Sequence, residues 1–254
     1  MSLIASHAAE SGHWYAQDGT PAYTIVGSNG KVRPTTLRDA RRLNLVPSVT
    51  TILKAASQPG LDRWKQEQVL LAALTLPKVD SESDDEYIAR ILDDSKDAAR
   101  SAADAGTDIH ASIEAFYRGE VRDRHQEHVQ GVVTALGERY GQQPWVAERS
   151  FAHDAGFGGK VDLHAPSFVV DVKTKEFADP NKLQGYDEHL MQLAAYRVGL
   201  GMPEARCANV FVSRSVPGLC VVREWTQVEL TIGWKMFHSL LNYWQLKNEI
   251  HSRF

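Results

Sequence analysis

The spacing of apolar and polar residues divides the chain into a helical N-terminal part and a β-rich part with helices on both sides. Ile109, Ile113 and Phe116 recur at helical spacing and predict a long, Ala-rich helix over 87–117. We expect other helices just after Ser48, from about residue 61, and over 126–140, 182–200 and 228–250. Short β-rich runs predict strands over 145–151, 158–163, 168–174, 208–213 and 219–225.

The N-terminal part contains three less regular segments. Residues 13–35 are typical of a β-hairpin, with turn residues at 28–30. Residues 80–86 carry five acidic side chains in seven positions and are expected to be a solvated linker or a helix start. Gly106-Thr107 marks a break in the long helix or a close packing contact.

Helices on both sides of consecutive strands predict an α/β fold, with a central mixed β-sheet flanked by helices and a helical N-terminal lobe. We place the N-terminal hairpin and helical lobe at residues 1–105 and the core at residues 106–254.

Composition narrows the classes of protein that the chain can be. The 254 residues are 43% hydrophobic, which is ordinary for a globular protein. A net charge of −4 argues against binding nucleic acid through bulk charge, but it allows a local basic groove. Cys207 and Cys220 alone cannot build a disulfide framework or a four-cysteine iron–sulfur site. No signal peptide or membrane span is evident, so we expect a soluble cytoplasmic protein with reduced thiols.

Two neighbouring β-rich runs each contain an aspartate, and a hairpin between the runs would place the two aspartates opposite each other. If Pro166-Ser167 is the centre of the turn between them, opposite residues have numbers that sum to 333, and Asp162 faces Asp171. Like charges placed opposite each other destabilise a sheet. At an effective dielectric constant of 20 the repulsion is on the order of 3 kcal/mol. A compensating group is therefore expected near the pair.

Lys173 follows Asp171 by two residues and lies on the same face of the strand. Two carboxylates and an amine suit a site for Mg²⁺ or Mn²⁺ in which the lysine positions or deprotonates a metal-bound water. An exposed sheet face with a salt bridge is the alternative. Asp94-Ser95-Lys96 has the same spacing in a polar, helical segment, so spacing alone does not define a site.

Other polar residues occur in an order that resembles a known family. Gly106-Thr107-x-x-His110, Glu148, Gly159-x-x-Asp162, Asp171-x-Lys173 and Gln192-x-x-x-Tyr196 follow one another along the chain. This order resembles the RecB-like branch of the PD-(D/E)xK nucleases. Through DVKTK and the following YDEHLMQLAAYRVGL it is similar to phage-type exonucleases and mitochondrial genome maintenance exonucleases. The resemblance covers about residues 48–200.

The resemblance implies a restriction-endonuclease-like core and a role for each matching residue. It implies metal binding by His110, Asp162, Asp171 and the carbonyl of Val172. Lys173 would be the catalytic lysine, and Gln192 and Tyr196 would position the scissile phosphate or the site. Glu148 would support the site or bind a second metal. Ser48, Thr50 and Thr51 match the DNA-contacting stretch of the family more loosely.

Trp64 and Lys65 are further candidates for contact with a single strand, because aromatic rings stack on bases and cations follow phosphates. A core position is the alternative for Trp64. The segment Gly156–Lys160 does not match a nucleotide-binding loop, because Val161 stands where that motif needs Ser or Thr. We therefore expect no nucleotide cofactor.

The predicted function is that of a Mg²⁺- or Mn²⁺-dependent DNA exonuclease acting on single-stranded DNA or processed ends in recombination, repair or replication. The expected partner is DNA, and no membrane is involved. Two alternatives stay open: a structure-specific endonuclease on the same core, and a catalytically silent protein that binds DNA ends. The missing cysteines exclude the iron–sulfur members of the branch.

Overall fold

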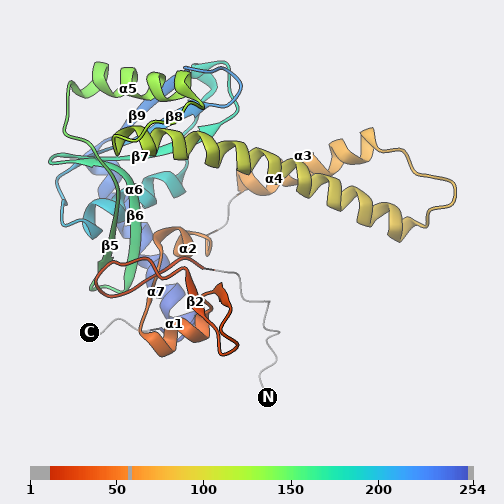
Figure 1. Cartoon of the computed structure of the whole chain (residues 1–254), viewed down its shortest axis with the longest axis horizontal. Helices are drawn as coiled ribbons and strands as arrows, with labels where there is room; N and C mark the ends of the chain where they lie inside the picture. The colour runs from red at the N-terminus through yellow and green to blue at the C-terminus, as the bar shows by residue number, and fades with distance from the viewer. Residues whose placement is uncertain (1–11, 57–58, 251–254) are drawn as a thin grey trace.

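The computed structural model describes residues 12–56 and 59–250 (Figure 1). Its helices are α1 (Leu37–Leu43), α2 (Val49–Leu53), α3 (Pro59–Thr75), α4 (Asp84–Tyr117), α5 (Gln126–Tyr140), α6 (Asp187–Gly199) and α7 (Gln227–Lys247). Its strands are β1 (Trp14–Tyr15), β2 (Thr24–Val26), β3 (Val32–Pro34), β4 (Val46–Pro47), β5 (Val146–His153), β6 (Phe157–Ala165), β7 (Phe168–Lys175), β8 (Arg206–Ser213) and β9 (Cys220–Trp225). The helix expected from residue 182 begins at Asp187, because Pro180–Lys182 form a separate 3-10 turn.

The central sheet has the strand order β5-β6-β7-β8-β9. β7 and β8 run parallel, with α6 in the crossover between them, whereas the other neighbouring pairs are antiparallel. α6 and α7 cover one face, where Leu193 and Phe237 pack with Val169. α5 and the C-terminal half of α4 cover the other, where Ile113 packs with Val170. The predicted α/β fold, with a mixed sheet between helices, is confirmed.

The β6–β7 hairpin has the predicted register, but its ladder ends one pair before the two aspartates. The turn lies at Pro166-Ser167, and the paired residues have numbers that sum to 333: Leu163 with Val170, His164 with Val169, and Ala165 with Phe168. Farther on, within the described residues, β6 is paired with β5, apart from an isolated bridge between Gly158 and Ser48, and β7 is paired with β8. β6 and β7 therefore separate at Asp162 and Asp171, which are not paired with each other. We call this point the fork.

The backbone of β5 and β6 is irregular at the fork. Val161 packs in the α6–α7 core and Leu163 in the α4–α5 core, although residues two apart on a regular strand share a face. In the β5–β6 ladder, Ala147 and Arg149 are paired with β6, but Glu148 between them is not. The register places Glu148 opposite Asp162, and its φ is 58°. Such a left-handed conformation is uncommon for a residue with a side chain. The irregularity leaves Asp162 at a bend in β6.

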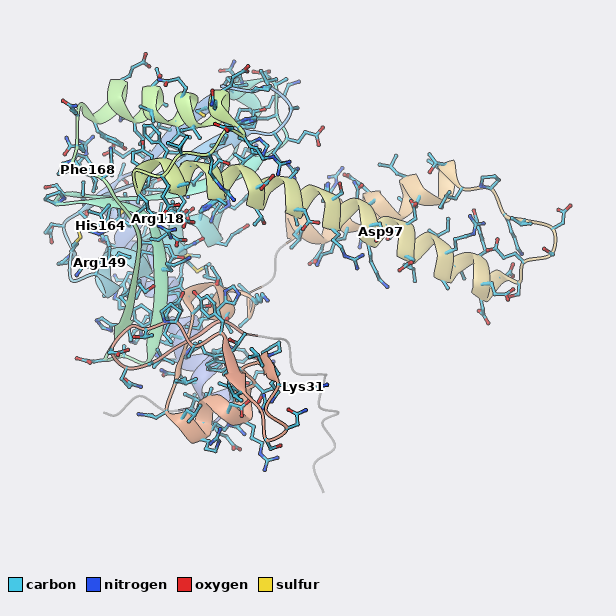
Figure 2. All side chains as sticks on the ribbon, viewed as in Figure 1. Lys31, Asp97, Arg118, Arg149, His164 and Phe168 are labelled. Carbon is cyan, nitrogen blue, oxygen red and sulfur yellow. The ribbon has the colours of Figure 1, made fainter. Side chains whose placement is uncertain are left out.

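α4 links the sheet to a projecting two-helix arm (residues 59–97), formed by α3 and the first part of α4 (Figure 1). Figure 2 labels Asp97 on the arm and Arg118 at the other end of α4, beside the strands. α4 begins at Asp84 with a Ser83 cap, so the acidic segment 80–86 is part connection and part helix start. The boundary placed after residue 105 falls inside this continuous helix, and the two-part division stays a prediction.

The long helix is unbroken at Gly106, which is a close packing contact. A Cβ atom at this position would lie 2.5 Å from the Thr174 hydroxyl on β7. The absence of a side chain therefore lets α4 approach the sheet beside the fork.

The predicted N-terminal hairpin needs correction. β2 and β3 form a hairpin across the predicted turn, but Trp14–Tyr15 pairs with Val46–Pro47 and lies outside that hairpin. The reason is a long-range contact, because buried Trp14 packs edge-on against Trp244 of α7. The segment after β3 contains the short helix α1, whose arginines are exposed and whose Ala40 is buried. In the described part of the chain, the helices are too short or too polar to cross a membrane.

Candidate active site

Asp171 and Lys173 form the centre of a buried polar cluster at the fork. Alternate residues of β7 share a face, so both side chains lie on the side of the sheet covered by α6. Lys173 Nζ lies 2.9 Å from Asp171 Oδ1, and donates to Gln192 Oε1 at 2.9 Å. Gln192 Nε2 donates to Asp171 Oδ1 at 2.9 Å and to the Tyr196 hydroxyl at 2.8 Å. The amide of Gln192 thus holds the carboxylate and the ammonium in one arrangement.

Asp162 is held from the other side of the fork. Its Oδ2 accepts the backbone N–H of Val172 at 2.7 Å and lies 3.0 Å from His110 Nε2. This backbone N–H binds a side chain because the β6–β7 ladder has already ended. His110 comes from α4, in the part that packs against β7 beside Gly106. The fork therefore gathers His110, Asp162 and Asp171 from three separate elements.

A buried asparagine completes the surroundings of Asp171. Asn209 Nδ2 donates to Asp171 Oδ2 at 2.8 Å, and its Oδ1 accepts Trp225 Nε1–H at 2.8 Å. Asn209 was not predicted as a site residue, although a single amide in the otherwise apolar run Ala208–Val212 is a signal that could have singled it out. Since buried polar groups are normally hydrogen-bonded, such a residue indicates a polar partner inside the fold.

The charges at the fork shift one another's pKa values. Burial raises the pKa of Asp171 to about 6, with Lys173 opposing the shift and Asp162 adding to it. Burial disfavours the charged form of His110, but the Asp162 carboxylate outweighs it and raises the His110 pKa to about 8. Burial acts in the same direction on Lys173, yet the two aspartates raise its pKa above the usual value. Lys173 is therefore a cation at neutral pH.

A second group of charges lies one helical turn from His110. Glu114 and Glu148 both contact Arg118, and Glu148 also contacts Lys160. Burial and a hydrogen bond with Glu148 raise the pKa of Glu114 to about 7. The contacts of Glu148 in the structure are thus with this group, whereas Asp162 contacts His110 and Val172.

The fork opens into a cleft of about 450 Å³. One wall is the segment of α4 around Gly106 and His110, and the other includes Lys173 and Thr174 of β7 and Arg214, which follows β8. Arg214 was not predicted as a site residue, and no local pattern in the sequence marks it. The cleft gives solvent access to Lys173, whose side chain is 26% exposed, whereas Asp171 is 1% exposed.

The predicted DNA-contacting residues lie outside this cluster. Ser48 is buried and caps α2, accepting the N–H of Thr51 at 3.0 Å, and Thr50 is exposed. Trp64 is half-buried and Lys65 exposed, both on α3 of the arm. Tyr196 is buried with its hydroxyl bonded to Gln192, so it supports the site rather than facing the cleft.

The donor types at the fork suit a hard divalent cation, since carboxylate oxygens are combined with one imidazole nitrogen. The described residues contain no group of three or more His, Cys, Asp and Glu side chains already arranged around a common metal position. In the structure His110 instead contacts Asp162 directly. Metal binding by these residues stays a prediction.

Comparison with known proteins gives limited information. No family model matches the chain, and no curated protein matches it in sequence. Among solved structures it is similar to the crystal structure of SSO0001, with 17% identity, a TM-score of 0.26, and coverage of 47% of this chain and 61% of that one. It is also similar to an alkaline exonuclease (LHK-Exo) from Laribacter hongkongensis, with 15% identity, a TM-score of 0.28, and coverage of 51% and 76%. Both likenesses are slight.

Proposed function

We propose that this chain is a metal-dependent DNA exonuclease with a restriction-endonuclease-like core of the PD-(D/E)xK kind. The observation that carries the proposal is the cluster at the fork, where two carboxylates, an imidazole and an ammonium meet beside an open cleft. A structural salt bridge would need only one acid and one base. Two acids in one cluster, of which Asp171 is buried and Asp162 half-buried, are costly to maintain, which favours a functional role.

His110, Asp162, Asp171 and the carbonyl of Val172 would hold Mg²⁺ or Mn²⁺. The donor set fits either ion, and the imidazole shifts the preference toward Mn²⁺. To bind the ion, His110 would have to lose its proton and its contact with Asp162. A bound ion of this kind polarises the scissile phosphate and lowers the pKa of a water ligand.

Lys173 would orient the attacking water and the phosphate as a hydrogen-bond donor. Without a bound ion, the two aspartates raise its pKa, so it is protonated at neutral pH and can donate. Its contacts with Asp171 and Gln192 fix the direction of the ammonium. Gln192 and Tyr196 would therefore act as positioning residues.

The proposal is tested with linear DNA labelled at the 5′ or the 3′ end, single- or double-stranded, in Mg²⁺, Mn²⁺ or EDTA. We expect the metal-containing samples to release labelled nucleotides, and Asp171→Ala and Lys173→Ala to lower the rate by roughly 10²-fold or more. Asp94→Ala and Lys96→Ala are matched controls, because these residues have the same spacing on exposed positions of α4. Wild-type rates in either site variant would refute the assignment.

Covalently closed single-stranded circles separate the proposal from the endonuclease alternative. An enzyme that begins at an end leaves the circle intact, whereas an endonuclease cuts it. Metal-independent retention of DNA without any product would favour the silent end-binding protein.

A further inference from the structure

The cleft beside the fork contains a cation that the proposed chemistry does not use. Lys173, which contacts Asp171, lines this cleft, and Arg214 lines the same cleft from the segment after β8. The opposite wall, on α4, contributes the small residues Ala103, Gly106 and Thr107 together with His110 and Glu114. The two basic side chains, Lys173 and Arg214, therefore lie across the cleft from α4.

The backbone that carries Arg214 is fixed to the end of β7. The Arg214 N–H donates to the Lys175 carbonyl at 2.8 Å. The preceding Ser213 hydroxyl donates to the Phe177 carbonyl at 2.5 Å and accepts the Val216 N–H at 3.0 Å. The base of the side chain therefore has a defined position relative to Lys173.

The parallel β7–β8 register gives the distance between the two cations along the sheet. Lys173 pairs with Phe211 and Lys175 with Ser213, so Arg214 is level with a position three residues beyond Lys173. At about 3.3 Å per residue, this corresponds to roughly 10 Å along the strand. A DNA strand that runs along the cleft with its scissile phosphate at Lys173 would place a neighbouring phosphate on the side of Arg214.

We infer that Arg214 forms a second phosphate subsite, which binds a phosphodiester next to the scissile one. This inference rests on the proposed function, since it takes the fork as the scissile position. A guanidinium suits the task because its planar fork of N–H groups can bind two phosphate oxygens at once. Thr174, beneath Gly106 in the same cleft, adds a hydroxyl within the subsite.

The inference is tested by binding of a fluorescein-labelled single strand in EDTA, where no hydrolysis occurs. Arg214→Gln should weaken binding roughly tenfold, as expected for one charged hydrogen-bonded contact. The slope of log affinity against log salt should fall by about 0.7, the value for one phosphate of a single strand. Arg214→Lys should recover part of the affinity. Arg122→Gln removes the same charge from an exposed position lining another pocket, so it should behave as wild type.

The contact is located with a set of DNA strands, in each of which a neutral methylphosphonate replaces one phosphate. Wild type should lose affinity when a particular phosphate is neutralised, and Arg214→Gln should be insensitive to that replacement. Equal sensitivity of the two proteins at every position would overturn the inference.

Hydrolysis distinguishes this failure from failure of the proposed function. If wild type gives metal-dependent product and Arg214→Gln binds and cleaves as well as wild type, only the subsite inference is overturned. DNA binding that depends on Arg214, without product under any metal condition, overturns the nuclease proposal and leaves the subsite supported. A wild-type protein that neither binds nor cleaves overturns both.

Discussion

Both oxygens of the Asp171 carboxylate have a hydrogen-bond partner. Lys173 and Gln192 contact Oδ1, and Asn209 contacts Oδ2. The contact between Asp171 and Lys173 could be predicted from the sequence, because residues two apart on a strand share a face. The contact between Asp171 and Asn209 could not, because Asn209 lies on β8, 38 residues away, and is brought alongside only by the parallel crossover.

Proton release from His110 should accompany metal binding. Its pKa of about 8 means that most His110 side chains are protonated at pH 7 and must lose the proton before Nε2 can bind an ion. Competition by the proton weakens as the pH rises through this pKa. The affinity for Mn²⁺ should therefore increase roughly tenfold between pH 7 and pH 9.

Titration calorimetry in buffers of different ionisation enthalpy measures both quantities, without DNA and without activity. At pH 7 we expect release of close to one proton per ion. His110→Gln should bind more weakly, and its affinity should depend less on pH in this range. An affinity for Mn²⁺ that stays constant from pH 7 to pH 9 would contradict a role for His110 as a ligand.

The elements that depend on local pattern were predicted best. The helix over 126–140 and the turn at Pro166-Ser167 agree with the structure, because apolar spacing and turn residues act within a few positions. The pairing of β1 with β4 depends on distant side chains and was not predicted. The fork was also missed, since it requires the Asp162 carboxylate to take the Val172 N–H that a regular ladder would use.

The approach of α4 to β7 can be tested at Gly106. Ala is the better helix former by about 1 kcal/mol, but its Cβ would collide with the Thr174 hydroxyl. We expect Gly106→Ala to lower the free energy of unfolding by about 1–3 kcal/mol, as for other overpacked contacts. Adding Thr174→Ala should restore much of this loss, because it removes the colliding oxygen.

Gly137→Ala is the matched control for this experiment. Gly137 lies on α5, and a Cβ atom there would meet nothing within 4 Å. Urea unfolding should show this variant to be as stable as wild type or up to about 1 kcal/mol more stable. A Gly106→Ala protein that gains stability as Gly137→Ala does would show that α4 is free to move away from the sheet.

For the whole molecule, the sequence predicted the layers better than the arrangement of the parts. Strands between helices indicated an α/β sandwich, and the sheet, with α4 and α5 on one face and α6 and α7 on the other, agrees. The arm of α3 and α4 was not predicted (Figure 1), because helical periodicity does not say whether a helix packs on the sheet or projects from it. The same long helix brings His110 to the fork and carries the arm away from it.

The central claim is that the fork holds a divalent cation between residues from α4, β6 and β7. Anomalous diffraction from crystals of the protein soaked in Mn²⁺ tests it most directly. The account predicts a manganese peak bound by His110, Asp162 and Asp171, with the contact between His110 and Asp162 replaced by bonds to the ion. A map without a peak at the fork, in which His110 still contacts Asp162, would contradict it.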